Sequence, residues 1–192
     1  FWLGLMWDKA GDHGKAIPAF EGYLKLPEAD TQASNRETCY FKIMENHVKA
    51  EAWDKAVETG EMLIKTYPGS KLLGQAMGEL GRNYRRKGDV DKAMALWAQA
   101  AEQKYSHAIF DMVDVHMLNG ELDKAKAVCA KGMEVLQKDA TKGTLGELLA
   151  FVNAIGTPAP APEGVVCVSG GEAPAAWGPK PALLYFTPVV MP

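Results

Sequence analysis

The chain has 192 residues, of which 47% are hydrophobic and 23% charged, and its formal net charge is −3. A chain of this length and composition can bury a hydrophobic core without help from disulfides or a structural metal. The small net charge, with both signs mixed along the chain, argues against a basic surface for nucleic acid or anionic membrane. No apolar run approaches the ~20 residues of a membrane-spanning helix. The chain begins with Phe1 rather than Met, which leaves its compartment open.

A Lys-Ala pair that follows a turn-like segment recurs along the chain. The pairs are Lys15-Ala16, Lys55-Ala56, Lys92-Ala93 and Lys124-Ala125, which lie 40, 37 and 32 residues apart. Helical spacing of apolar residues flanks each turn, and a period in the thirties with this pattern is typical of stacked helix-turn-helix repeats. Proteins built in this way are usually binding surfaces rather than catalysts.

Two hairpins are predicted around the first two turns, and a third, between about Ser70 and Tyr105, shows the pattern most clearly. In its first helix, apolar residues recur every three or four positions and so share one face; they are Leu73, Met77, Leu80 and Tyr84. Gly81 interrupts this face at a cost of ~1 kcal/mol relative to alanine, which favours close approach by a neighbouring helix. Gly88 is predicted to end the first helix, and Asp89 to cap the second. The apolar face predicted for the second helix consists of Ala93, Met94, Trp97, Ala100 and Ala101.

The third unit resembles the tetratricopeptide repeat, whose pattern is a Leu-Gly pair, an aromatic residue, Ala, a large residue, Ala and a closing Pro or aromatic residue. The matching positions are Leu80-Gly81, Tyr84, Ala93, Trp97, Ala100 and Tyr105. The first unit keeps Leu3-Gly4, Ala16, Phe20 and Pro27, the second keeps Ala56, Leu63 and Pro68, and the fourth keeps Ala125. The second unit departs from the pattern at Met44 and Gly60, and the fourth at Val113 and Cys129.

This resemblance implies an all-α fold over residues 1–156: a right-handed superhelix of four helical hairpins and a capping helix. The apolar residues predicted to face the stack from the capping helix are Leu145, Leu148, Leu149, Val152 and Ile155. The segment Leu63–Ser70 also resembles the repeat joints of tetratricopeptide proteins of the bacterial envelope. The expected location is therefore the periplasm or cell envelope, with the cytoplasm as the alternative.

In the tetratricopeptide family the first helix of each hairpin lines a concave groove that binds a protein or peptide. Carried onto this chain, the family pattern selects Thr38, Phe41 and Glu45, then Gln75, Arg82 and Arg85, then His107, Phe110 and Asp114. Arg82, Arg85 and Arg86 are predicted to form a basic cluster that grips a peptide carboxylate. The predicted partner-binding residues are thus Phe41, Glu45, Gln75, Arg82, Arg85, Arg86, Phe110 and Asp114. A solvated charged surface is the alternative interpretation.

After the repeats the composition changes. Residues 157–164 are predicted to be an extended Pro/Ala linker, because the Thr-Pro-Ala-Pro-Ala-Pro segment cannot continue a helix. Residues 165–192 contain two short strand candidates, Val165–Val168 and Ala182–Phe186. The segment Gly178–Thr187 resembles the strand that leads into the active site of thioredoxin-like domains, but the Trp-Cys-x-x-Cys motif of those domains is missing after it. We therefore expect either an extended tail or the start of a second, thioredoxin-like domain.

Cysteines and histidines give no sign of a metal or redox site. Cys39, Cys129 and Cys167 form no Cys-x-x-Cys pair. Cys129 is predicted to be a small buried hydrophobe, whereas Cys39 and Cys167 are predicted to be exposed or paired. His47 and His116 fall at repeat positions that a packing aromatic residue usually fills, and we expect both to be partly buried. No catalytic, cofactor-binding or metal-binding residue is therefore expected.

Three functional hypotheses follow. The first is a non-catalytic scaffold that binds a protein or peptide through the concave face. The second is a repeat domain that positions a thioredoxin-like oxidoreductase. The third is a structural subunit that packs permanently into a larger envelope or membrane assembly without itself spanning the membrane. None of the three requires a cofactor in the residues of this chain or contact with nucleic acid.

Overall fold

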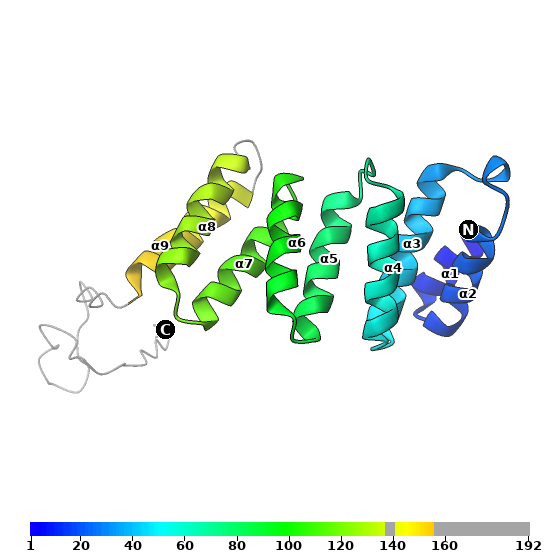
Figure 1. Cartoon of the computed structure of the whole chain (residues 1–192), viewed down its shortest axis with the longest axis horizontal. Helices are drawn as coiled ribbons and strands as arrows, with labels where there is room; N and C mark the ends of the chain where they lie inside the picture. Colours follow the sequence, from blue (N-terminus) through cyan, green and yellow to red (C-terminus); the bar gives the residue numbers. More distant parts are fainter. Residues whose placement is uncertain (137–140, 156–192) are drawn as a thin grey trace, which may run out of the picture. The chain divides into compact units, whose positions relative to one another are not determined.

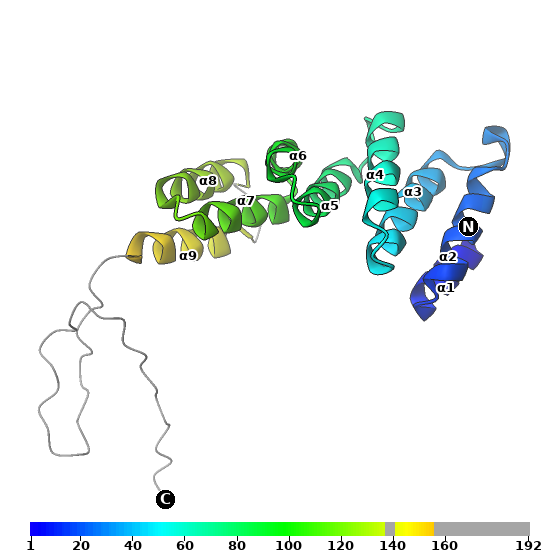
Figure 2. The same ribbon diagram turned by 60° about the horizontal axis from the view of Figure 1, so that its bottom comes forward.

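The computed structural model of the protein describes residues 1–136 and 141–155. Within these ranges the chain forms α1 (Trp2–Ala10), α2 (His13–Leu24), the 3-10 turn η1 (Glu28–Asp30), α3 (Ala33–Lys49), α4 (Trp53–Thr66), α5 (Leu73–Arg86), α6 (Val90–Glu102), α7 (Ser106–Leu118), α8 (Leu122–Val135) and α9 (Thr141–Ala154). From α1 to α8 each helix packs against the next along the chain, as Figures 1 and 2 show. The predicted all-α architecture of four hairpins, α1–α2, α3–α4, α5–α6 and α7–α8, is confirmed.

The recurring turn is a helix end followed by a helix cap. In the third hairpin, Gly88 has a φ of 86°, a left-handed conformation that glycine adopts without steric cost. The Asp89 side chain then accepts a hydrogen bond of 3.2 Å from the backbone N–H of Lys92, which caps α6 as predicted. Ala93, the residue after this lysine, is fully buried between the helices. The first hairpin repeats the arrangement with Gly11, Asp12, Lys15 and Ala16.

A pair of residues of complementary size lies where the two helices of a hairpin meet. In the third hairpin the pair is Gly81 and Trp97: a Cβ atom added at Gly81 would lie 2.5 Å from Trp97 Nε1. The predicted close approach at Gly81 is therefore confirmed. In the first hairpin the pair is Gly4 and Phe20, and a Cβ atom at Gly4 would lie 2.6 Å from the phenyl ring.

The second hairpin reverses this pair, and this explains its departure from the repeat pattern. Met44 on α3 is the large residue and Gly60 on α4 the small one, so that a Cβ atom at Gly60 would lie 2.8 Å from Met44 Sδ. In the fourth hairpin Val113 and Cys129 are of intermediate size, and both are buried in one cluster. The four hairpins thus fill the same space, but the second and fourth divide the volume between their two helices differently from the first and third.

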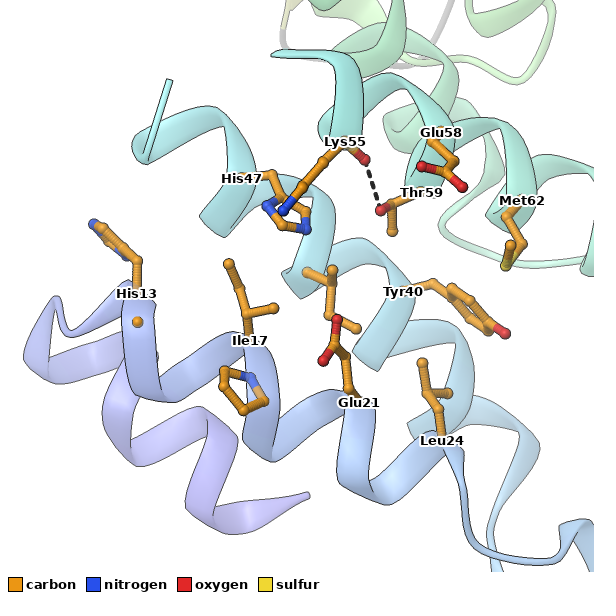
Figure 3. A pocket seen from close by; sticks show the side chains of 13 residues that line it. His13, Ile17, Glu21, Leu24, Tyr40, His47, Lys55, Glu58, Thr59 and Met62 are labelled. Atoms are coloured by element: carbon orange, nitrogen blue, oxygen red, sulfur yellow. Dashed lines mark hydrogen bonds between the residues drawn. The ribbon is translucent and has the colours of Figure 1, made fainter. Parts of the chain in front are cut away.

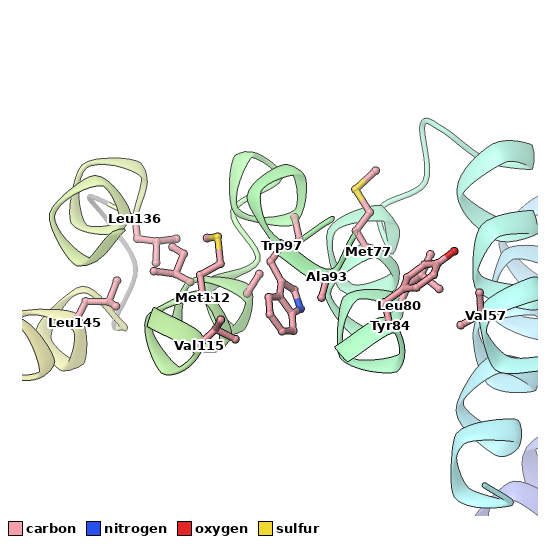
Figure 4. Close-up of a cluster of buried hydrophobic side chains, with 13 residues drawn as sticks. Val57, Met77, Leu80, Tyr84, Ala93, Trp97, Met112, Val115, Leu136 and Leu145 are labelled. Atoms are coloured by element: carbon pink, nitrogen blue, oxygen red, sulfur yellow. The ribbon is translucent and has the colours of Figure 1, made fainter. Parts of the chain in front are cut away.

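The largest cluster of buried side chains runs through successive hairpins without a break (Figure 4). It consists of Val57, Met77, Leu80, Tyr84, Ala93, Trp97, Ala100, Ala108, Ile109, Met112, Val115, Leu136 and Leu145. The last member comes from α9, and Val152 of the same helix packs in a second cluster with Cys129. As predicted for a terminal helix, α9 therefore covers the end of the last hairpin, although Ile155 after it is 38% exposed.

One compact unit extends from Phe1 to Val152. The predicted boundary at residue 156, the linker 157–164 and the tail 165–192, including Cys167, lie outside the described residues. The predicted domain boundaries and the right-handed superhelical path stay predictions. No helix formed by residues 1–136 and 141–155 is both long and apolar enough to cross a membrane.

Candidate functional site

The solvent-facing side of the first helices α1, α3, α5 and α7 is the surface that the sequence predicts to bind a partner, and ion pairs link its side chains. Asp8 on α1 accepts from Lys42 Nζ at 3.2 Å and from Lys49 Nζ at 3.1 Å, both on α3. Burial alone would raise the pKa of Asp8, but Lys49 and Lys42 outweigh it and hold the pKa below its usual range. Lys42 also pairs with Glu45, one of the predicted site residues, at 2.7 Å.

Arg82 is held in the same way by two carboxylates of its own chain. Its Nη1 lies 2.7 Å from Glu79 and its Nε 2.8 Å from Asp111 of α7. Partial burial disfavours the charged guanidinium, but the two carboxylates outweigh this effect and raise the pKa of Arg82. Two carboxylates of the chain thus already hold Arg82 through its Nη1 and Nε atoms, and its predicted contact with a partner's carboxylate stays a prediction.

The other two arginines of the predicted cluster point to different neighbours. Arg85 lies beside Arg82 on the same surface, with its Nη1 3.7 Å from the exposed carboxylate of Asp114. Arg86 turns away: its guanidinium lies 5.2 Å from the centre of the Trp53 ring on α4, and its Nη1 donates to Asn83 Oδ1 at 3.2 Å. The structure thus brings Arg82, Arg85 and Asp114 together but leaves Arg86 outside the cluster.

Three more predicted site residues lie on or below this surface. Phe41 is only 5% exposed and packs in a cluster with Met44 and Leu63, so most of its side chain serves the core, and its predicted contact with a partner stays a prediction. Phe110 is half-buried and packs against the largest core cluster. Gln75 is half-buried near the start of α5. The apolar side chains chosen from the family pattern therefore serve mainly the core.

A groove opens elsewhere, between the second helices α2 and α4 with α3 as its floor (Figure 3). It encloses about 590 Å³. Its apolar lining consists of Ile17, Pro18, Leu24, Ile43 and Met62. Its polar lining consists of His13, Glu21, Tyr40, His47, Lys55, Glu58 and Thr59. We call this the first groove.

His47 lies at the floor of the first groove and is 9% exposed. It makes no hydrogen bond with any residue in the described ranges. Burial, together with Lys55, lowers the pKa of His47, while Glu21 and Glu58 act in the opposite direction. His47 is thus a polar side chain that is more than nine-tenths buried, lines a cavity and has no hydrogen-bonding partner there.

An equivalent groove lies one repeat further, between α4 and α6 with α5 as its floor. It encloses about 310 Å³ and is lined by Glu61, Ile64, Lys65, Leu80, Tyr84, Lys92, Ala95 and Leu96. We call it the second groove. All of its residues except Lys65 correspond to lining residues of the first groove at the repeat spacings of 40 and 37 residues.

A tyrosine of the chain itself supplies the hydrogen-bond donor in the second groove. The Tyr84 hydroxyl donates a hydrogen bond to Glu61 Oε1, and Lys92 Nζ lies 4.9 Å from the centre of the Tyr84 ring. Burial and the Glu61 carboxylate raise the pKa of Tyr84 to about 12. The ring therefore stays a neutral hydrogen-bond donor that satisfies the carboxylate across the groove.

Comparison with known proteins identifies the fold. No known protein-family profile matches the sequence, and no curated protein does. Among solved structures, the chain is similar to a crystal structure of a putative kinesin light chain from Podosopora anserina, which is described as having nearly identical TPR-like repeats. The TM-score is 0.57 at 14% sequence identity, over 78% of this chain and 81% of that one.

The chain has a TPR-like helical-repeat fold. The tetratricopeptide pattern read from the third unit is confirmed at this level. At 14% identity the similarity concerns the fold alone.

The TPR-like hairpins hold their thiols in the core. Cys129 is fully buried, as predicted, and burial raises its pKa. Cys39 is also fully buried and unpaired, and burial raises its pKa to about 11. The prediction that Cys39 is exposed or paired is therefore wrong, since it packs with Ala16 and Phe20 of α2. Within the described ranges, no three His, Cys, Asp or Glu side chains are grouped so that they could hold a metal ion.

Sequence reasoning placed His47 as a partly buried packing residue, which is confirmed, but it missed the groove around it. The signal was present in the repeat register. Glu21 precedes Glu61 by 40 residues, and His47 precedes Tyr84 by 37, so a shared site on the second-helix side could have been read from the aligned units.

Proposed function

We propose that this protein is a non-catalytic interaction scaffold that binds a polypeptide segment of a partner in the first groove. The observation that carries the proposal is an open groove with a partly apolar lining and a buried His47 that has no hydrogen-bonding partner in the described ranges. An apolar lining with a few polar groups is the usual composition of a ligand site, in which the apolar part gives affinity and the polar groups give orientation.

The size of the first groove supports a peptide as the ligand. Its volume of about 590 Å³ lies within the range of about 300–1,000 Å³ that is typical of ligand pockets. The groove runs between two helices and opens to solvent along them, so a segment can lie in it and place alternate side chains on the floor. Glu21 and Glu58 reach the groove from opposite helices, as Figure 3 shows.

The test is selection of peptides from a displayed random library on the immobilised full-length chain. We expect the Glu58→Trp variant to bind the enriched peptides at least tenfold more weakly, because the indole would fill the first groove. Ala95→Trp is the matched control, since Ala95 occupies the equivalent exposed position of the second groove. If the Glu58→Trp variant binds the enriched peptides as tightly as the unchanged chain, the first groove is not their binding site.

A second proposal for the binding surface is the predicted concave face, which is the solvent-facing side of the first helices α1, α3, α5 and α7. Arg85 supports it, because its only paired carboxylate among the described residues, Asp114, is exposed and 3.7 Å away, a weak pair that a partner's carboxylate could replace. The same selection tests this proposal. Peptides that bind the Arg85→Glu variant more weakly, but bind the Glu58→Trp variant as well as the unchanged chain, would bind the concave face.

A second candidate function, a permanent subunit of a larger assembly, is favoured by exposed apolar residues on α1. Leu3 is 57% and Met6 69% exposed. The residues at the equivalent positions of the next three hairpins are all buried; they are Ile43, Leu80 and Met112 for Leu3, and Asn46, Asn83 and Val115 for Met6. We propose that a helix covers Leu3 and Met6, either from a partner subunit or from a part of the protein that precedes Phe1.

Sedimentation velocity at sub-micromolar concentration tests the subunit proposal on protein purified from its source. A permanent subunit is expected to sediment within a larger complex and to leave it when Leu3 and Met6 are both changed to Lys. A stable, freely sedimenting single chain would contradict this proposal.

The remaining finer predictions also stand as proposals. A periplasmic or envelope location rests on the Leu63–Ser70 joint, and immunoblotting of separated cell fractions would test it. A thioredoxin-like continuation rests on residues 178–187, which lie outside the described residues, and a disulfide-reduction assay on the protein from its source would test it.

A further inference from the structure

The two grooves are the same site in two successive repeats, and their differences indicate what the first groove binds. His47 stands where Tyr84 stands in the second groove, and Glu21 stands where Glu61 stands. In the second groove the tyrosine hydroxyl donates to the glutamate across the gap. The chain therefore contains an example of what satisfies a carboxylate at this position.

In the first groove that donor is missing. The imidazole of His47 makes no hydrogen bond within the described ranges, and neither does the side chain of Glu21 or Glu58. The first groove is also the larger, at about 590 Å³ against about 310 Å³ for the second. It therefore has both room for an aromatic ring and an acceptor for its hydroxyl.

We propose that the first groove binds a partner segment that inserts a tyrosine side chain, with its ring against the apolar lining residues and its hydroxyl donating to Glu21. This inference rests on the proposed function, because it names the side chain that the groove selects. The hydrogen bond from a neutral phenol to a carboxylate is charge-assisted and therefore stronger than one between neutral groups.

The charges of the first groove disfavour other occupants. A phosphotyrosine would bring its phosphate against Glu21 and Glu58, which repel it. A lysine would be attracted by the same two carboxylates, but its ammonium group would lose hydration among the apolar lining residues and enter a groove that already holds Lys55, beside His47 (Figure 3). Glu21 is exposed in the free chain, where water supplies its hydrogen-bond donors. A phenylalanine would displace this water from the groove without offering a donor in its place.

Four synthetic nine-residue peptide libraries provide the probe. They differ only in the fixed central residue, which is Tyr, Phe, Lys or phosphotyrosine, and the other positions are equimolar mixtures. Capture on the immobilised full-length chain is measured for each library. We expect the Tyr library to be captured at least tenfold more than the Phe library, and the Lys and phosphotyrosine libraries no more than on the Glu58→Trp variant.

Three variants test which residues cause the expected preference for tyrosine over phenylalanine. Glu21→Ala removes the acceptor and is expected to bring the Tyr-to-Phe ratio close to one. Glu61→Ala, the matched change in the second groove, is expected to leave the ratio unchanged. His47→Tyr would supply the phenol from the chain itself and is expected to abolish capture of the Tyr library.

The outcomes separate this inference from the proposed function. If the Glu58→Trp change abolishes capture but the Phe library binds as well as the Tyr library, the first groove binds peptides and the tyrosine inference is wrong. If the Tyr-to-Phe ratio survives Glu21→Ala, the inference is also wrong. If no library is captured above the Glu58→Trp background, the first groove is not a peptide site and the proposed function fails with it.

Discussion

Replacing Trp97 with alanine is expected to lower the free energy of unfolding by about 3–5 kcal/mol. Trp97 is fully buried in the cluster that joins the third and fourth hairpins (Figure 4). Its indole N–H donates to the carbonyl oxygen of Gly78 at 3.0 Å, so the change would also remove this buried hydrogen bond. The neighbouring Gly81 has no side chain that could move into the cavity, which places the expected loss in the upper part of the range for such substitutions.

The loss is measured by urea unfolding of the full-length chain, followed by circular dichroism at a helical wavelength. Trp2→Ala is the control, because it removes the same atoms from a side chain that is 75% exposed. We expect it to change the unfolding free energy by no more than about 0.5 kcal/mol. A loss below about 1 kcal/mol for Trp97→Ala would contradict the packing of α5 against α6.

Features that depend on local sequence could be predicted for this chain. The turn at Gly88 and Asp89 was predictable because a left-handed glycine and a helix cap act over a few residues. The close approach at Gly81 was predictable because glycine within a helix is costly without a packing reason. The terminal helix followed from the spacing of Leu145 and Val152, and both are buried.

The surface could be predicted less well, because its contacts join residues from different hairpins. The family pattern selected Arg82 correctly as a residue of the first-helix surface, but its pairing with Asp111 depends on the register of α5 against α7. Phe41 has the helical spacing of an inner-face residue, yet its side chain fills space beside Met44. The sequence predicts an exposed or paired Cys39, whereas the side chain is buried against Phe20 of the preceding hairpin.

The second hairpin carries its large residue, Met44, on the first helix and its small residue, Gly60, on the second. Exchanging these two residues is therefore expected to have a large effect on stability. Met44→Gly alone is expected to cost about 3–5 kcal/mol of unfolding free energy, because it leaves a cavity and adds a glycine within α3. Gly60→Met alone is expected to cost about 1–3 kcal/mol, because its Cβ atom would lie 2.8 Å from Met44 Sδ and 3.1 Å from Leu80 Cδ1.

Combining the two changes restores the arrangement of the first and third hairpins, with the small residue on the first helix and the large one on the second. The double variant is therefore expected to be more stable than the Met44→Gly variant, with a favourable coupling energy of about 2–3 kcal/mol between the two sites. A double-mutant cycle in urea measures this coupling. Additive losses would mean that the two residues do not share one space, and that the second hairpin is packed by a different rule from its neighbours. A favourable coupling would show that the repeat constrains the total volume at this crossing and leaves free which helix supplies it.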